Sequence, residues 1–130
     1  MIGVDTNVLV RAIVDDDPAQ GEAARQWMKT HVREGIVVDG VVLCELVWVL
    51  RARYRLGRRD IIEVLASLLD TVGITILDDG AVRAALRRYQ SGGGDFADYL
   101  IAERCRGAGA ERVATFEQTL TARDGFTRIR

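Results

Sequence analysis

The pattern that decides the fold begins with Met1-Ile2-Gly3-Val4-Asp5-Thr6-Asn7-Val8-Leu9. The short apolar run at residues 1–4 predicts a strand that ends at Asp5, and residues 7–14 predict a helix directly after it. Short apolar runs and amphipathic helices alternate in the same way along the rest of the chain. This alternation predicts an α/β fold, with a parallel sheet of four to five strands covered by helices on both faces.

The same pattern places the remaining elements. Asp17 followed by Pro18 is typical of a helix start, because aspartate caps the helix and proline fits its first turn. Gly92-Gly93-Gly94 predicts a flexible break. Strands are predicted at residues 36–38, 74–77 and 112–116, with a possible edge strand at 126–129. Helices are predicted at residues 18–32, 41–55, 61–72, 82–89 and 96–106.

Length and composition indicate one globular domain, residues 1–130, with 48% hydrophobic and 28% charged residues. The apolar run at residues 41–50 is interrupted by Glu45 and is too short to cross a bilayer, so we expect no membrane span. We also expect no signal peptide. Cys44 and Cys105 lie in apolar helical stretches, which favours reduced core thiols in a cytoplasmic protein.

The net charge of -1 restricts how the chain can bind nucleic acid. Proteins that bind through bulk charge are usually basic, so a role with nucleic acid needs a local patch or a metal site. One basic cluster surrounds Tyr54. We interpret it either as a solvated helix end or as a surface that contacts RNA phosphates or an acidic partner segment. Its members are Arg51, Arg53, Arg55, Arg58 and Arg59.

Five acidic residues stand at positions where an α/β sheet binds ligands. Asp5 follows the first strand, and Glu117 follows the strand at 112–116. Asp95 and Asp98 open the helix at 96–106 and share one face of it. Glu45 lies inside the apolar helix at 41–55. Ligands bind outside the carboxyl ends of parallel strands, so all five side chains are candidates for one site.

Each acidic residue also has a purely structural interpretation. Asp5 is suited to cap a helix, Asp95 and Asp98 resemble a capping box, and Glu117 has the character of a surface residue. Glu45 is the most informative, because a buried charge is costly unless it is paired with arginine, protonated or bound to metal. A divalent cation would relieve the repulsion between neighbouring carboxylates. Oxygen ligands without histidine or cysteine favour Mg²⁺ or Mn²⁺ over Zn²⁺.

Five segments along the chain carry a further pattern: Val4–Leu9, Asp16-Asp17-Pro18 with Gln20, Leu43–Leu50, Asp95–Ala102 and Thr115–Glu117. In this order they resemble the PIN-domain ribonucleases over the whole chain. Each motif alone is weak, but the ordered set is specific. The length without an added domain is similar to that of the VapC-type toxins of bacterial toxin–antitoxin pairs.

The resemblance implies a single PIN-like domain with a central first strand, Mg²⁺-dependent cleavage of RNA, a homodimer and an antitoxin partner. It implies metal-binding roles for Asp5, Glu45 and Asp98, with Asp95 and Glu117 beside them as catalytic residues. The family often has aspartate where this chain has Glu117. Because glutamate is one methylene longer, we expect it to reach a second metal position differently or through water. The supporting polar groups implied are Thr6, Asn7 and Thr115.

Other functions remain open at this point. A catalytically silent PIN module that binds RNA or a protein partner is the main alternative, and a housekeeping PIN nuclease is another. Two further enzyme or signalling classes are disfavoured. A phosphatase of the haloacid-dehalogenase type needs a second aspartate two residues after the first, where this chain has Asn7. A receiver domain needs a lysine near its last strand, whereas the only lysine in this chain is Lys29.

Overall fold

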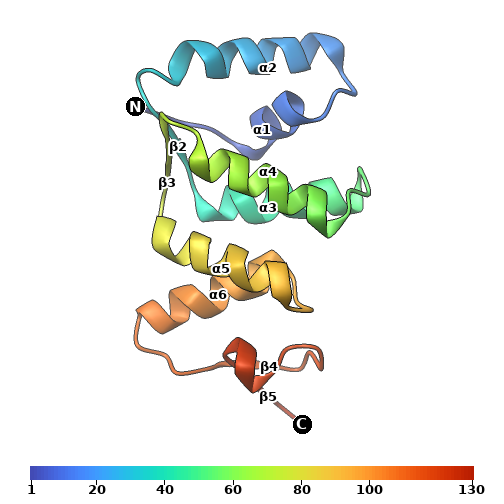
Figure 1. The fold of residues 1–130 in the computed structure, drawn as a ribbon, viewed down its shortest axis with the longest axis vertical. Helices are drawn as coiled ribbons and strands as arrows, with labels where there is room; N and C mark the ends of the chain where they lie inside the picture. Colours follow the sequence, from blue (N-terminus) through green and yellow to red (C-terminus); the bar gives the residue numbers. More distant parts are fainter. The chain divides into compact units, whose positions relative to one another are not determined.

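The computed structural model describes all 130 residues and divides the chain into two compact units (Figure 1). The N-terminal unit is Met1–Leu77 and the C-terminal unit is Asp78–Arg130. The N-terminal unit contains β1 (Ile2–Gly3), α1 (Thr6–Ile13), α2 (Pro18–His31), β2 (Ile36–Val38), α3 (Gly40–Ala52), α4 (Arg58–Asp70) and β3 (Ile74–Ile76). The C-terminal unit contains α5 (Asp79–Ser91), α6 (Phe96–Gly107), β4 (Val113–Thr115), a 3₁₀ turn (Ala122–Asp124) and β5 (Phe126–Arg128).

The N-terminal unit is built on a three-stranded parallel sheet in the order β1-β2-β3. Its register pairs Ile36 with Ile2 on one side and with Ile74 on the other. Ile36 and Val38 are completely buried, as expected for the middle strand of a parallel sheet. The middle strand is therefore β2. Within this unit β1 and β3 flank it on either side.

Helices pack on this sheet and on one another, with α1 against α2 and α3, and α3 against α4. Apolar residues at helical spacing form the core, as the sequence predicts. Its fully buried members include Leu9, Leu43, Leu46, Leu50, Ile61 and Leu65. The helix at 41–55 is apolar nearly all round, from which burial is expected, but its face with Val41 and Trp48 is open, since these residues are 57% and 56% exposed. Val72, predicted within a helix, lies beyond α4 and is 92% exposed.

In the C-terminal unit α5 packs against α6. The helix predicted at residues 82–89 is confirmed within α5, and its apolar residues at helical spacing are all buried: Val82, Ala85, Leu86 and Tyr89. Tyr89 meets Phe96 of α6 edge to face, with ring centroids 6.2 Å apart. β4 and β5 form a two-stranded parallel sheet, and Val113 packs on a small cluster of Ala102, Leu120 and Phe126.

The predicted parallel α/β fold is confirmed, and its five strands appear near the expected positions. Three strands form a parallel sheet in the N-terminal unit, and the other two form a parallel sheet in the C-terminal unit. The alternation of apolar and polar residues specifies which face of a strand is buried, but it does not specify which strand lies beside it.

None of the helices combines the length and hydropathy that a membrane span requires. Cys44 and Cys105 form no disulfide and are half-buried, so they lie less deeply than predicted.

Candidate functional site

Three polar residues of the candidate site come together where α1 begins. Asp5 caps α1, and its Oδ1 accepts a hydrogen bond of 3.1 Å from the backbone N–H of Val8. The hydroxyl of Thr6 donates to Oε1 of Glu45 at 3.2 Å, across 39 residues of sequence. This bond joins the first turn of α1 to α3, so Thr6 holds the Glu45 carboxylate on the side of the unit where Asp5 caps α1.

Glu45 is exposed, which corrects the interpretation of it as a buried charge. Its exposed neighbours on α3 are Val41, Trp48 and Ala52. These positions are three or four residues apart and therefore share one face of the helix. No arginine pairs with Glu45, and its partner is the neutral Thr6 hydroxyl. Most of the apolar residues next to Glu45 in sequence lie on the opposite, buried face of α3. Their presence on both sides of Glu45 in the sequence therefore led to a wrong prediction of its burial.

Asp95 and Asp98 open α6 and form a capping box, as the sequence predicts. The backbone N–H of Asp95 donates to Oδ2 of Asp98 at 3.0 Å. The segment before them is fixed as well, because the N–H of Gly94 donates to the buried hydroxyl of Tyr99 at 2.9 Å. The two carboxylates are therefore held at the start of a helix whose first turn is anchored in the core, and the predicted flexible break is a packed turn.

Glu117 follows β4 and is exposed. Its N–H donates to Oγ1 of Thr115 at 3.0 Å, and its Oε1 accepts from both the N–H and the hydroxyl of Thr119 at 3.2 Å. Thr115, an expected supporting residue, thus contacts the backbone of Glu117. The Glu117 carboxylate stabilises its own turn, which agrees with its interpretation as a surface residue.

The donor chemistry of these residues suits a hard divalent cation. Carboxylate oxygens are the ligands that Mg²⁺ and Mn²⁺ prefer. Asp5, Glu45 and Asp98 each use one carboxylate oxygen for a hydrogen bond within the chain and keep the other without one. Within either unit, no group of three or more His, Cys, Asp or Glu side chains lies close enough to hold a metal ion. Asp5 and Glu45 belong to the N-terminal unit, whereas Asp98 belongs to the C-terminal unit.

A hydrogen-bonded network near the end of α3 was not predicted. Asp16 accepts from the Tyr54 hydroxyl at 2.6 Å and pairs with Arg11 at 2.9 Å. The Tyr54 hydrogen bond is the main reason that the pKa of Asp16 lies below its usual value, and the same bond raises the pKa of Tyr54. The network ties the loop between α1 and α2 to the end of α3. Tyr54 lies 38 residues beyond Asp16, and no local spacing in the sequence indicates their contact.

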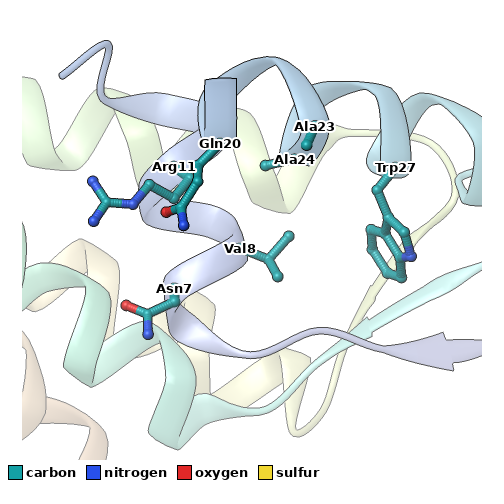
Figure 2. Close-up of a pocket in the computed structure, with 7 residues that line it drawn as sticks. All are labelled: Asn7, Val8, Arg11, Gln20, Ala23, Ala24 and Trp27. Atoms are coloured by element: carbon teal, nitrogen blue, oxygen red, sulfur yellow. The ribbon is translucent and has the colours of Figure 1, made fainter. Parts of the chain in front are cut away.

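A groove of about 350 Å³ lies between α1 and α2. Figure 2 shows Val8 and Trp27 on its apolar side, with Arg11 and Gln20 at the other end. Asn7, a predicted supporting residue, lines this groove. Trp27 also stacks on His31 with ring centroids 4.5 Å apart, which fixes one wall of the groove. Its full lining is Asn7, Val8, Arg11, Gln20, Ala23, Ala24 and Trp27.

The basic cluster occupies the end of α3, the turn that follows it and the start of α4. Arg51, Arg55 and Arg59 are exposed and Arg58 is half-buried. Arg55 adopts a left-handed backbone with φ 54° in this turn. The cluster is therefore accessible to an anionic ligand, as either of its two interpretations requires.

The family model described as "PIN domain" matches residues 2–125, which is nearly the whole chain. No curated protein matches the chain at a significant level.

Proposed function

The chain belongs to the PIN-domain family, and from this membership we propose that it is a Mg²⁺-dependent endoribonuclease that acts as the toxin of a toxin–antitoxin pair. PIN domains are generally metal-dependent nucleases and typically use Mg²⁺ or Mn²⁺. The observation that carries the proposal is the extent of the match, because residues 2–125 include all five acidic residues that the sequence singles out.

We assign the metal-binding roles to Asp5, Glu45 and Asp98. When bound, a divalent cation would supply positive charge to the phosphate and activate water for in-line attack. Glu45 or Asp95 orients that water or accepts its proton, and no protein nucleophile takes part. The Thr6 hydroxyl holds the Glu45 carboxylate through their hydrogen bond of 3.2 Å. Glu117 is the least supported member, since its Oε1 is engaged by Thr119.

Removal of divalent metal is expected to abolish RNA cleavage. The proposed carboxylate ligands cannot by themselves supply the positive charge that phosphodiester hydrolysis needs. We would incubate the protein with labelled single-stranded RNA, add a chelator, and then restore Mg²⁺ or Mn²⁺ in excess. RNA with metal but without protein is the control for spontaneous hydrolysis. Cleavage that persists in chelator would contradict the metal requirement, and absence of cleavage under every condition would favour the silent RNA- or protein-binding module.

The partner that we propose is a small antitoxin, and the groove between α1 and α2 is its docking surface. The groove offers an apolar wall of Val8, Ala24 and Trp27 beside a polar end with Arg11 and Gln20. This pattern suits an amphipathic segment that buries an apolar side chain against tryptophan. Tryptophan is among the residues that most often dominate binding energy at interfaces.

Trp27→Ala is therefore expected to weaken antitoxin binding by at least about tenfold. The neighbouring gene product would be co-expressed, purified with the chain and titrated against each variant by calorimetry. The chain has a second tryptophan, Trp48, outside the groove, and Trp48→Ala is the matched control. Equal losses of antitoxin affinity in the two variants would remove the groove from the proposal.

Sedimentation analysis of the same samples tests the proposed homodimer. If expression is harmless and no partner co-purifies, the toxin role fails, while a housekeeping PIN nuclease remains compatible with cleavage.

A further inference from the structure

A second groove lies on the C-terminal unit, between the first three turns of α5 and the end of α6. Its volume is about 580 Å³, within the range of sites for small molecules. Arg106, which lines the groove, lies about 12 Å along the axis of α6 from Asp98, at a rise of about 1.5 Å per residue. The groove is lined by Asp78, Gly80, Ala81, Ala84, Arg87, Glu103, Arg104, Arg106 and Gly107.

The two carboxylates in this groove are already neutralised. Glu103, whose side chain is only 10% exposed, pairs with Arg88 of α5 at 3.0 Å. Asp78 pairs with Arg104 at 3.4 Å. Two arginines of the lining remain, Arg87 from α5 and Arg106 from α6, and neither has an ion-pair partner in the structure. The lining of the groove therefore includes two arginines without an ion-pair partner, on a chain whose net charge is -1.

We propose that this groove between α5 and α6 is a phosphate-binding site, in which Arg87 and Arg106 contact one phosphate-bearing ligand. The guanidinium fork matches the geometry of phosphate oxygens and stays charged at any physiological pH. The ligand is either a free phosphate group, as in a nucleotide, or the backbone of an RNA strand. The site is separate from the metal-dependent chemistry proposed above, because its binding groups include neither Asp95 nor Asp98.

The lining favours a phosphate ligand over an acidic protein segment. A docked peptide normally gains affinity by burying apolar side chains. The only apolar side chains that line this groove are those of Ala81 and Ala84. The small residues leave room in the groove for a ligand, and the charged side chains provide nearly all of the interactions that a ligand could make there. Binding driven by charge over a polar surface is typical of phosphate contacts.

The test compares two double variants that remove the same charge. Arg87→Gln/Arg106→Gln removes the proposed binding pair. Arg33→Gln/Arg128→Gln removes two arginines that lie outside the groove and are exposed. Each protein is titrated with orthophosphate, with a nucleoside monophosphate and with single-stranded RNA, in chelator so that no metal-dependent cleavage occurs. Binding is followed by the amide NMR signals of Ala81, Ala84 and Gly107, and RNA affinity is measured by fluorescence anisotropy at several salt concentrations.

We expect orthophosphate to shift the groove signals of the wild type, and the first double variant to weaken binding by at least about tenfold. If the natural ligand is RNA, log affinity also falls less steeply with log salt concentration in this variant. The magnitude of the slope decreases by about 0.7 for each RNA phosphate that the variant no longer neutralises. If a nucleotide is the source, the variant weakens orthophosphate and nucleotide binding but leaves the RNA affinity and its salt dependence unchanged. Equal behaviour of the two double variants overturns the proposal, as does a set of phosphate-shifted signals that excludes the groove.

Discussion

Asp98→Asn is expected to reduce RNA cleavage by at least about a hundredfold, equivalent to about 2.7 kcal/mol of transition-state stabilisation. Asparagine has the size of aspartate and keeps an oxygen that accepts a hydrogen bond. It therefore preserves the bond of 3.0 Å from the Asp95 N–H that starts α6. The substitution removes the negative charge that we assign to a metal ligand, so function is lost while the helix start is retained.

The chain contains a close structural control for this variant. Asp124 accepts from the Thr121 N–H at 3.0 Å in a second capping box, at the 3₁₀ turn before β5. Asp124→Asn thus tests the effect of the same substitution on a cap without touching the candidate site. Cleavage, circular dichroism and the rise in melting temperature produced by Mg²⁺ would be measured for both variants. If Asp98→Asn and Asp124→Asn behave alike, Asp98 has only its capping role.

The same design applies to Asp5. Asp5→Asn retains the acceptor for the Val8 N–H and is expected to lose cleavage to a similar degree. Asp17 caps α2 by accepting from the Gln20 N–H at 3.1 Å, the same distance that Asp5 makes to Val8. Asp17→Asn is therefore the matched control. Unchanged cleavage by Asp5→Asn would withdraw its metal-binding role.

Local signals in the sequence predicted the elements of this fold well. Asp17 and Pro18 marked the start of α2, and the apolar spacing on α5 identified its buried face. These signals succeed because capping and helical periodicity depend on residues within one or two turns. The partners of the strands depend on contacts between distant segments, so local signals do not specify that β2 lies between β1 and β3.

The environment of single residues was harder to predict. Glu45 sits among apolar residues in sequence, yet it lies on the exposed face of α3 because its angular position decides its burial. The network of Arg11, Asp16 and Tyr54 depends on a contact across 38 residues. The assembly of the acidic residues into one metal-dependent site remains a prediction, drawn from the order of the motifs along the chain and from family membership.

The glycines before Asp95 illustrate the difference between composition and packing. Three successive glycines predict flexibility, but two of them are tightly packed. A Cβ on Gly92 would overlap the Tyr99 hydroxyl and lie 2.8 Å from Cζ of that ring. A Cβ on Gly94 would lie 2.7 Å from Cδ2 of Leu120. A Cβ on Gly93 would meet no atom within 4 Å, so Gly93 is the only one of the three with open space.

Gly92→Ala is therefore expected to destabilise the fold by about 1–3 kcal/mol or more, because it overpacks a rigid site. Tyr99 is completely buried and its hydroxyl accepts the Gly94 N–H at 2.9 Å, so the ring cannot move aside without losing that bond. Gly93→Ala, one residue away, is expected to be neutral or to stabilise by about 0.4–1 kcal/mol through the unfolded chain. Urea unfolding of both variants measures the difference.

The substitution should also affect function, because Gly92 lies three residues before Asp95 in the segment that fixes the start of α6. A displaced turn would move Asp95 and Asp98 together. Gly92→Ala is thus expected to lose RNA cleavage even at temperatures where it remains folded, whereas Gly93→Ala keeps it. Equal stability and equal cleavage of the two variants would show that the segment is as flexible as its composition indicates, and that the contact of Gly92 with Tyr99 does not hold the helix start in place.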